Sequence, residues 1–359
     1  MASTSALPKT MLAWQKHYPG STPIRAEVPV PSVSDDGLLI KVHAAGVCHS
    51  DVALLSMPER KGWYQEKYTL GHEGCGEIVQ VGSAVSDFQV GEMVTVLSVP
   101  GCGASSCPEC SNDLGQICET GEHYGIGHDG AFAPYMAIKA RAAVKLPAGV
   151  SVAHGAVGTD AVMTAYHAVV GRAQVSKNDT VLLFGLGGLG FNALQILRHI
   201  GANVIVVDKR QQVLDEAVSF GVSKDNVVPI DTSNIPEWIA AKGIKVDKVI
   251  DFVGHPDTFK AGIDAVRLGG TLVLIGLLSQ TVTLNLYDAL PKQVNILCSF
   301  GGTHTDLRAS LDLIAKGVIV PQVQLGKLAD FPTILQDLHS GKIKSRIVLV
   351  PEGIENVQV

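Results

Sequence analysis

Basic segments and long apolar runs are both scarce in this sequence of 359 residues. Its 28 Lys and Arg residues are outnumbered by 34 Asp and Glu, so the formal charge is −6 and no basic block occurs. Nucleic-acid surfaces need clustered positive charge, so we expect no nucleic-acid partner. No apolar run approaches the roughly 18 residues of a membrane span, and residues 1–10 lack the apolar core of a signal peptide. We expect a soluble, cytoplasmic protein with no membrane partner.

Charged residues make up only 17% of the chain and hydrophobic residues 46%, so the sequence can bury large cores. A chain of 359 residues is too long for one small core and suggests two domains. The seven cysteines are odd in number. In a reducing compartment they are better read as metal ligands or buried small residues than as disulfides.

The first part of the chain is expected to be β-rich, with strands at residues 38–42, 76–81, 93–97 and 135–138. From about residue 152 strands and helices alternate, which predicts an α/β fold with a doubly wound parallel sheet. Its six expected strands are residues 180–184, 202–207, 226–229, 248–251, 271–275 and 295–299. The tail has two helical patterns and a last strand at residues 346–350, and we expect it to return to the first domain.

A glycine turn follows the apolar run 181–184, in the stretch V-L-L-F-G-L-G-G-L-G. Gly185 permits a sharp turn, Gly187 lets backbone amides approach a pyrophosphate, and Gly190 lets the next helix pack closely. The helix N-terminus, with Gly188 and Leu189, offers unpaired N–H groups to the anion. An ordinary strand-to-helix turn is the alternative.

Asp208 ends the next apolar run, where a carboxylate meets the adenosine ribose in dinucleotide-binding folds. Its charge would repel a ribose phosphate, which favours NAD over NADP. The basic residues Lys209 and Arg210 that follow weaken this preference.

Four cysteines with the spacing C-x4-C-x2-C-x7-C lie in one short stretch: Cys102, Cys107, Cys110 and Cys118. Four thiolates this close suit a closed tetrahedral zinc site with a structural role. A coincidental cluster and local disulfides are the alternatives.

A second set of metal-ligand residue types is dispersed. It comprises the stretch Cys48-His49-Ser50-Asp51, the pair His72-Glu73, and Asp160. No spacing rule ties these segments together, and a lone His such as His72 is more often structural than a ligand. From chemistry alone they remain candidates.

The stretches A-A-G-V-C-H-S-D, L-G-H-E-G, the four-cysteine loop and G-L-G-G-L-G occur in the order found in medium-chain zinc-dependent alcohol dehydrogenases. The resemblance runs from about residue 9 to residue 350. It implies a GroES-like β-rich catalytic domain of residues 1–155 and 301–359, and a Rossmann NAD-binding domain of residues 156–300. It also implies one catalytic and one structural zinc, NAD, an alcohol, ketone or aldehyde substrate, and a homotetramer or homodimer.

Carried over by position, the resemblance implies that Cys48, His72 and Asp160 are ligands of the catalytic zinc. Many relatives have a cysteine in place of Asp160, but the context T-D-A…T-A-Y-H-A resembles members with Asp there. Glu73 resembles a carboxylate that can approach the metal, and Asp51 one that orients the ligand His. One thiolate, one carboxylate and a neutral imidazole balance the zinc charge and leave a position for water or alcohol.

The resemblance also implies that Ser50 takes the alcohol proton and passes it to the cofactor ribose. Many relatives continue this relay with a His three residues on, but here that position is Ala53. Five further residues resemble cofactor contacts: His49, Gly276, Leu277, Phe300 and Arg346. For His49 and Arg346 the alternative is an ordinary surface residue.

Two features depart from the family pattern or stand outside it. Cys102 lies two residues further from Cys107 than usual, so its part in the structural zinc site is open. Cys75 and Cys298 are left over, and we interpret both as buried small hydrophobic residues.

The expected substrate pocket is apolar, with a first part of Leu54, Leu55, Met57, Trp63 and Tyr64 and further lining by Val99 and Leu277. This favours hydrophobic alcohols and ketones, and Asp160 favours secondary ones by analogy. A polyol dehydrogenase, a zinc-free quinone or enone reductase and a nucleotide-binding structural protein are the alternatives.

Overall fold

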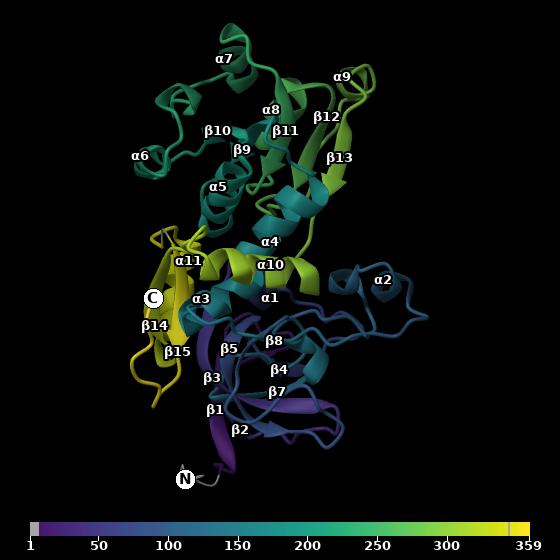
Figure 1. The fold of residues 1–359 in the computed structure, drawn as a ribbon, viewed down its shortest axis with the longest axis vertical. Coiled ribbons are helices and arrows are strands. Elements are labelled where there is room, and N and C mark those ends of the chain that lie inside the picture. Colours follow the sequence, from purple (N-terminus) through teal and green to yellow (C-terminus); the bar gives the residue numbers. More distant parts are fainter. Residues whose placement is uncertain (1–6, 344) are drawn as a thin grey trace. The chain divides into compact units, whose positions relative to one another are not determined.

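The computed structural model describes residues 7–343 and 345–359. The chain divides into two units (Figure 1). Unit 1 comprises Met1–Asp160, Thr303–Ala315 and Pro321–Val359, and unit 2 comprises Ala161–Gly302 and Lys316–Val320. The boundary lies between Asp160 and Ala161, five residues after the boundary that the family resemblance implies.

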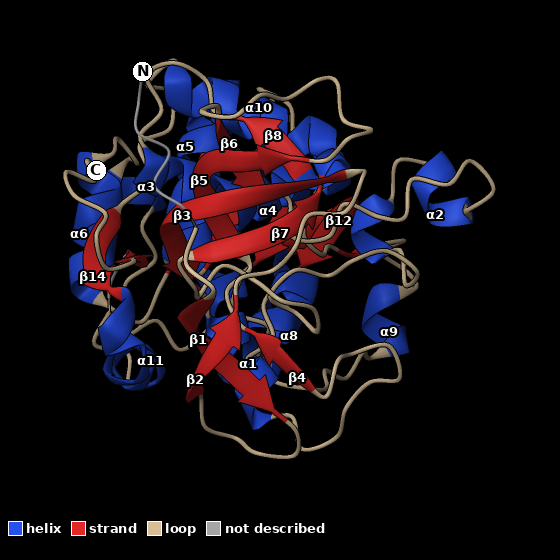
Figure 2. Ribbon diagram, turned by 90° about the horizontal axis from the view of Figure 1, so that it is seen from below, coloured by secondary structure: helices blue, strands red, loops and turns tan. Residues whose placement is uncertain are grey.

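Unit 1 is organised around a seven-stranded sheet of order β14-β15-β3-β5-β6-β8, with β7 also paired to β3 (Figure 2). Its strands are β3 (Gly37–Val47), β5 (Glu73–Val81), β6 (Met93–Val96), β7 (Tyr135–Lys139), β8 (Ala143–Lys145), β14 (Val323–Lys327) and β15 (Arg346–Val350). The tail strand β15 pairs antiparallel with β3, with Ile347 opposite Val47. The end of the chain therefore completes a sheet that its beginning starts.

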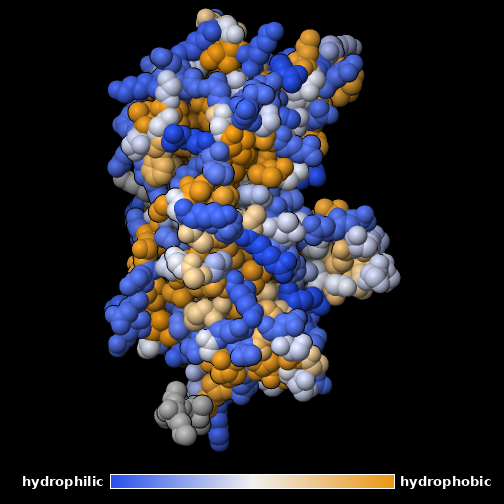
Figure 3. Space-filling view, viewed as in Figure 1, coloured by the Kyte–Doolittle hydropathy of each residue, from blue (hydrophilic) through white to orange (hydrophobic). Residues whose placement is uncertain are grey.

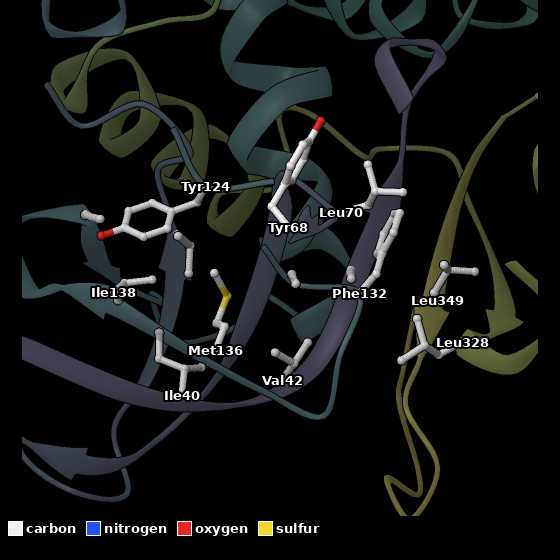
Figure 4. Close-up of a cluster of buried hydrophobic side chains, with 14 of the residues drawn as sticks. Ile40, Val42, Tyr68, Leu70, Tyr124, Phe132, Met136, Ile138, Leu328 and Leu349 are labelled. Atoms are coloured by element: carbon white, nitrogen blue, oxygen red, sulfur yellow. The ribbon is translucent and has the colours of Figure 1, made fainter. Parts of the chain in front are cut away.

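A three-stranded sheet of order β2-β1-β4 belongs to the same unit, with β1 (Thr10–His17), β2 (Ile24–Pro29) and β4 (Lys67–Thr69). Buried side chains from β4, from the larger sheet and from the tail form one core, and the partly buried Trp14 of β1 packs against it (Figure 4). Leu38, Ile40 and Val42 alternate toward it from β3. The helices of the unit are α1 (His49–Ser56), α2 (Pro108–Ser111), α3 (Val152–Val157), α10 (His304–Ala315) and α11 (Phe331–His339).

Unit 2 has a parallel sheet of order β10-β9-β11-β12-β13. Its strands are β9 (Thr180–Phe184), β10 (Asn203–Val207), β11 (Val246–Asp251), β12 (Val266–Leu274) and β13 (Asn295–Cys298). Val181 to Phe184 are fully buried, as expected for a central parallel strand covered on both faces. The helices between and before the strands are α4 (Met163–Tyr166), α5 (Gly188–Ile200), α6 (Gln211–Ser219), α7 (Ile235–Ala241), α8 (Pro256–Ala265) and α9 (Leu286–Ala289).

The prediction of a sixth strand at residues 226–229 is wrong. Residues Lys224–Asn226 form a 3-10 turn, and only one bridge, between Val206 and Val227, remains of the pairing. Val228 donates one hydrogen bond to Val206, but Pro229 has no N–H with which to extend the ladder. The doubly wound sheet therefore has five strands and ends at β10.

No helix in the described ranges 7–343 and 345–359 is long and apolar enough to cross a membrane.

Candidate active site and metal clusters

Four side chains with metal-ligating atoms converge in unit 1: Cys48, His72, Glu73 and Asp160. Their sulfur, nitrogen and oxygen atoms all lie within 4.8 Å of one another. The sequence places these residues in three separate segments, and the fold joins them. We refer to this group as the mixed cluster.

Cys48 and His72 are fixed by Asp51. Cys48 is the N-cap of α1, and its N–H donates to Asp51 Oδ2 at 2.9 Å. The other carboxylate oxygen, Oδ1, lies 3.3 Å from His72 Nδ1. Asp51 is fully buried, so its charge acts through these two groups rather than on solvent. The helix that starts at Cys48 thereby orients the imidazole.

Glu73 begins β5 directly after His72, in register with Gly46 on β3. A Cβ at Gly46 would lie 2.0 Å from Glu73 Oε2, so only glycine leaves space for the carboxylate there. Glu73 is fully buried, and burial raises its pKa to about 8 even though the guanidinium of Arg346 lowers it.

Asp160 reaches the cluster from a π-helical turn, Gly158–Val162, which interrupts the helix between α3 and α4. Its Oδ2 lies 4.0 Å from His72 Nε2. π-Helical turns are rare and are often found at functional sites. Here the irregular turn aims the carboxylate at the imidazole edge that Asp51 leaves free.

Arg346 completes the group from the tail strand β15. Its guanidinium donates to the carboxylates of both Glu73 and Asp160, and its Nε lies 3.2 Å from Glu73 Oε2. The side chain is buried, so these ion pairs are shielded from water. Arg346 was expected to contact the cofactor, and that role stays a prediction. The contact with Glu73 joins residues 273 positions apart, for which the sequence carries no signal.

The donors of the mixed cluster suit a zinc ion. Thiolate sulfur, imidazole nitrogen and carboxylate oxygen are the ligands that Zn²⁺ takes at catalytic sites. Burial by itself would lower the pKa of His72, but Asp51 raises it above its usual range. The same carboxylate would hold the ring of a metal-bound His72 through Nδ1 and leave Nε2 to the ion.

The four cysteines of the loop around α2 also come together, and we call them the sulfur cluster. The Sγ atoms of Cys102 and Cys110 are 3.7 Å apart, as are those of Cys107 and Cys118. A tetrahedron with zinc–sulfur bonds of about 2.3 Å has edges of about 3.8 Å. All four thiols are free, which removes the alternative of local disulfides, and Cys102 lies within the group despite its unusual spacing.

The thiols of the sulfur cluster differ in acidity. Burial opposes ionisation of Cys118, but hydrogen bonds from Thr120 and from the backbone lower its pKa to about 6. For Cys107, a backbone N–H favours the thiolate, but its hydrogen bond to Glu109 at 3.1 Å and burial raise the pKa to about 12. Without a cation the four sulfurs therefore do not all ionise near neutral pH.

The glycine turn of unit 2 has the geometry that the motif predicts. Gly185 has a φ of +84°, and a Cβ at Gly190 would lie 1.9 Å from the Gly185 carbonyl oxygen. Gly187 is the N-cap of α5, and nothing lies within 4 Å of the Cβ position there. Two glycines are thus needed for packing, and the third leaves open space at the helix N-terminus, where an anion binds.

Asp208 lies beside this turn. Its Oδ2 accepts the N–H of Leu186 at 2.8 Å, and both oxygens accept from the Arg210 guanidinium at 2.9 and 3.0 Å. Burial raises its pKa, but these hydrogen bonds outweigh that effect and lower it overall. Sequence reasoning treated Arg210 only as nearby positive charge and missed this pairing, whereas Lys209 is exposed.

The remaining predicted residues are accessible or partly accessible. Ser50 is exposed, with Oγ 3.5 Å from Cys48 Sγ, and His49 is exposed beside it. In unit 2, Leu277 is 83% and Phe300 54% exposed. Gly276 donates its N–H to the Asp251 carbonyl at 3.0 Å.

Three residues expected in the substrate pocket are buried in the core of unit 1, and their role in a pocket stays a prediction: Leu54, Leu55 and Tyr64. Met57 and Trp63 are only partly buried and keep accessible surface.

The two leftover cysteines differ. Cys75 is fully buried in β5, as expected. The expectation that Cys298 is buried is wrong: it is exposed, because it ends β13, which no other strand of the described residues flanks on its outer edge.

Two family models match the chain. The alcohol dehydrogenase GroES-like domain matches residues 34–148, and the zinc-binding dehydrogenase model matches residues 188–316. An alcohol dehydrogenase of Geobacillus stearothermophilus is 30% identical over 336 residues, covering 90% of this chain and 94% of that protein. Alcohol dehydrogenase 1 of Caenorhabditis elegans is 28% identical, covering 90% and 92%.

Solved structures agree. An acetophenone reductase from Geotrichum candidum in complex with NAD is 32% identical with a TM-score of 0.86, covering 96% of this chain and 98% of that one. The alcohol dehydrogenase of Aeropyrum pernix is 27% identical with a TM-score of 0.86, covering 95% and 100%. The expected fold class, a GroES-like domain with a Rossmann sheet, is confirmed. The chain belongs to the medium-chain zinc-dependent alcohol dehydrogenases and is an NAD-dependent oxidoreductase of this family.

Proposed function

We propose that this enzyme interconverts hydrophobic secondary alcohols and ketones. The carrying observation is the mixed cluster, in which Asp160 stands where many relatives have cysteine and lies within 4.8 Å of the Cys48 and His72 ligand atoms. Met57, the C-cap of α1, and Trp63 are partly exposed and offer apolar surface. The similarity to an acetophenone reductase supports a ketone as the carbonyl substrate.

In the proposed mechanism Cys48, His72 and Asp160 hold the catalytic zinc. The bound ion would act as a Lewis acid that favours loss of the alcohol proton, and NAD would accept the hydride. Asp51 orients His72, and Arg346 holds Glu73 and Asp160 in place. Ser50, exposed next to Cys48, takes the alcohol proton. Ala53 provides no base for a further relay, so the proton leaves by another route.

NAD is proposed to bind unit 2 through the turn formed by Gly185, Gly187, Gly188, Leu189 and Gly190. The open space at Gly187 and the N–H groups that begin α5 support a pyrophosphate site. The carboxylate of Asp208 would accept hydrogen bonds from the ribose hydroxyls. Further cofactor contacts are assigned to His49, Lys209, Gly276, Leu277, Phe300 and Arg346.

The sulfur cluster is proposed to hold a structural zinc. Four cysteine ligands would fill a tetrahedral zinc site and leave no position for water or substrate. The domain roles follow: residues 1–155 and 301–359 form the catalytic domain, and residues 156–300 form the NAD-binding domain.

We propose a homodimer or homotetramer located in the cytoplasm. Large apolar side chains are exposed on unit 2 around α9 and the segments next to the edge strand β13 (Figure 3). They are Leu268, Leu277, Leu278, Leu286, Tyr287, Leu290 and Phe300. Exposed apolar patches beside an edge strand are typical of association surfaces. Seven free cysteines are compatible with a reducing compartment.

A panel of alcohols and ketones with NADH and NADPH, run with and without a chelator, tests the proposal. We expect chelator-sensitive turnover of 2-alkanols and aryl ketones with NADH and slower turnover with NADPH. Faster turnover of sorbitol than of 2-alkanols would favour the polyol dehydrogenase. Full activity without zinc would favour a quinone or enone reductase, and no NAD reduction with any alcohol would favour a structural protein.

A further inference from the structure

The side-chain amide of Asn192 joins two segments to which the proposed function gives different tasks. Asn192 lies in α5 and is 3% exposed. Its Nδ2 donates to the carbonyl oxygen of Gly188 at 2.8 Å and to that of Ala161 at 3.1 Å. Gly188 is the first residue of α5, and Ala161 directly follows Asp160 in the π-helical turn. One amide therefore connects the pyrophosphate-binding turn to the neighbour of a metal ligand.

The Asn192 amide contacts a backbone carbonyl inside the π-helical turn. Buried backbone carbonyls are almost always hydrogen-bonded, and Ala161 is fully buried. An extra residue per turn disturbs the regular hydrogen-bond ladder, and a side chain from outside can then enter it. Asn192 supplies such a side chain, so its amide links the turn that carries Asp160 to the first turn of α5.

We propose that Asn192 is a positioning residue that couples NAD binding at the start of α5 to metal binding by Asp160. This inference rests on the proposed function. A pyrophosphate that orders the first turn of α5 fixes the Gly188 carbonyl, and with it the Asn192 amide and the Ala161 carbonyl. Coupling between two binding sites is reciprocal, so NAD and the metal each strengthen the binding of the other.

Gln195 offers a matched control on the same helix. It is 8% exposed, its Nε2 donates to the Val320 carbonyl at 3.3 Å, and its Oε1 accepts the Val320 N–H at 2.9 Å. The substitution Gln195→Leu therefore removes buried amide hydrogen bonds from α5, as Asn192→Leu does, but leaves the donor to Ala161 in place. A general loss of helix stability would appear in both variants.

The experiment measures how fast a chelator removes zinc from the holoenzyme, with and without saturating NAD. The phase that is missing in Cys48→Ser identifies the ion of the mixed cluster. In the wild type and in Gln195→Leu, NAD should slow this phase by roughly fivefold or more, the lower range of site-to-site coupling. In Asn192→Leu the protection should fall below about twofold, and zinc binding should no longer tighten NAD measured by fluorescence titration.

Equal protection by NAD in Asn192→Leu and wild type would overturn the proposal, and so would a wild type without protection. If Asn192→Leu does not fold, Asn192→Asp keeps the shape and replaces the donor by an acceptor. If the wild type binds NAD and holds zinc at Cys48, but NAD protects the zinc equally in all variants, the coupling alone is refuted. A chain that binds neither refutes the proposed function as well.

Discussion

The mixed cluster and the sulfur cluster both lie in unit 1, but different kinds of structure hold their side chains in place. The mixed cluster is held by the N-cap of α1, the start of β5, the π-helical turn that carries Asp160 and an arginine of β15. Arg346 already pairs with the carboxylates of Glu73 and Asp160, and Asp51 lies against the imidazole of His72. The sulfur cluster lies in a loop whose regular structure is a four-residue helix and a 3-10 turn. Among the described residues, no hydrogen bond or ion pair joins a cationic side chain to one of its four sulfurs.

This difference indicates what each metal does. The fold shapes the mixed cluster in advance and uses only three proposed ligands, so an ion there can serve chemistry at a remaining position. The loop of the sulfur cluster has little core of its own, so an ion there contributes mainly to folding. Removing a ligand should therefore affect activity in one cluster and stability in the other.

The substitution Asp160→Asn should have the largest effect. It removes one anionic ligand and one partner of Arg346, so we expect loss of one zinc per chain and more than about 100-fold lower turnover, beyond the range for outer partners. Metal analysis and NAD-coupled alcohol oxidation measure this. Asp247→Asn in unit 2, where Asp247 pairs with Arg267, is the control. Full zinc and full activity in Asp160→Asn would refute the ligand assignment.

The substitution Asp51→Asn should come next. The amide still accepts the Cys48 N–H but no longer places a negative charge 3.3 Å from His72 Nδ1. Partners of this kind typically change metal affinity or activity by about 10–100-fold. Zinc affinity by competition with a chelator and kcat/KM should both fall in that range, with little change in unfolding temperature. Unchanged zinc affinity would contradict the role of Asp51.

The substitution Cys110→Ser should mainly reduce stability. Loss of the structural ion is expected to lower the unfolding temperature by about 4–8 °C, which corresponds to roughly 2 kcal/mol for a domain of this size. Turnover per folded chain should fall much less than in Asp160→Asn. Differential scanning calorimetry and metal analysis test this, and an activity loss as large as that of Asp160→Asn would remove the distinction between the clusters.

The smallest effect is expected for His123→Phe. His123 Nε2 lies 2.8 Å from the Cys118 carbonyl, and its ring is 4.0 Å from that of Trp63. Phenylalanine preserves the ring contact and loses the hydrogen bond, at a cost of about 1 kcal/mol. The unfolding temperature should fall by about 2–4 °C, with both zinc ions retained. Loss of zinc in this variant would show that the sulfur cluster is less independent of its surroundings than we infer.

The sequence by itself determined the local features. The spacing of Cys102, Cys107, Cys110 and Cys118 predicted a sulfur cluster, because ligands close in the chain can meet within one loop, but it left the part of Cys102 open. The glycine turn was equally readable, since its strand, turn and helix follow one another directly. The family resemblance then joined the dispersed segments of the mixed cluster, which no spacing rule connects.

Only the tertiary structure decided the contacts between distant segments. It placed Arg346 on Glu73 and Asp160, which lie 273 and 186 residues away. It also reduced the sixth strand to one bridge and exposed Cys298 at a sheet edge. Periodicity reports which side of an element is apolar, but a side chain's partners depend on which strands become neighbours, and that is settled by the packing of the whole chain.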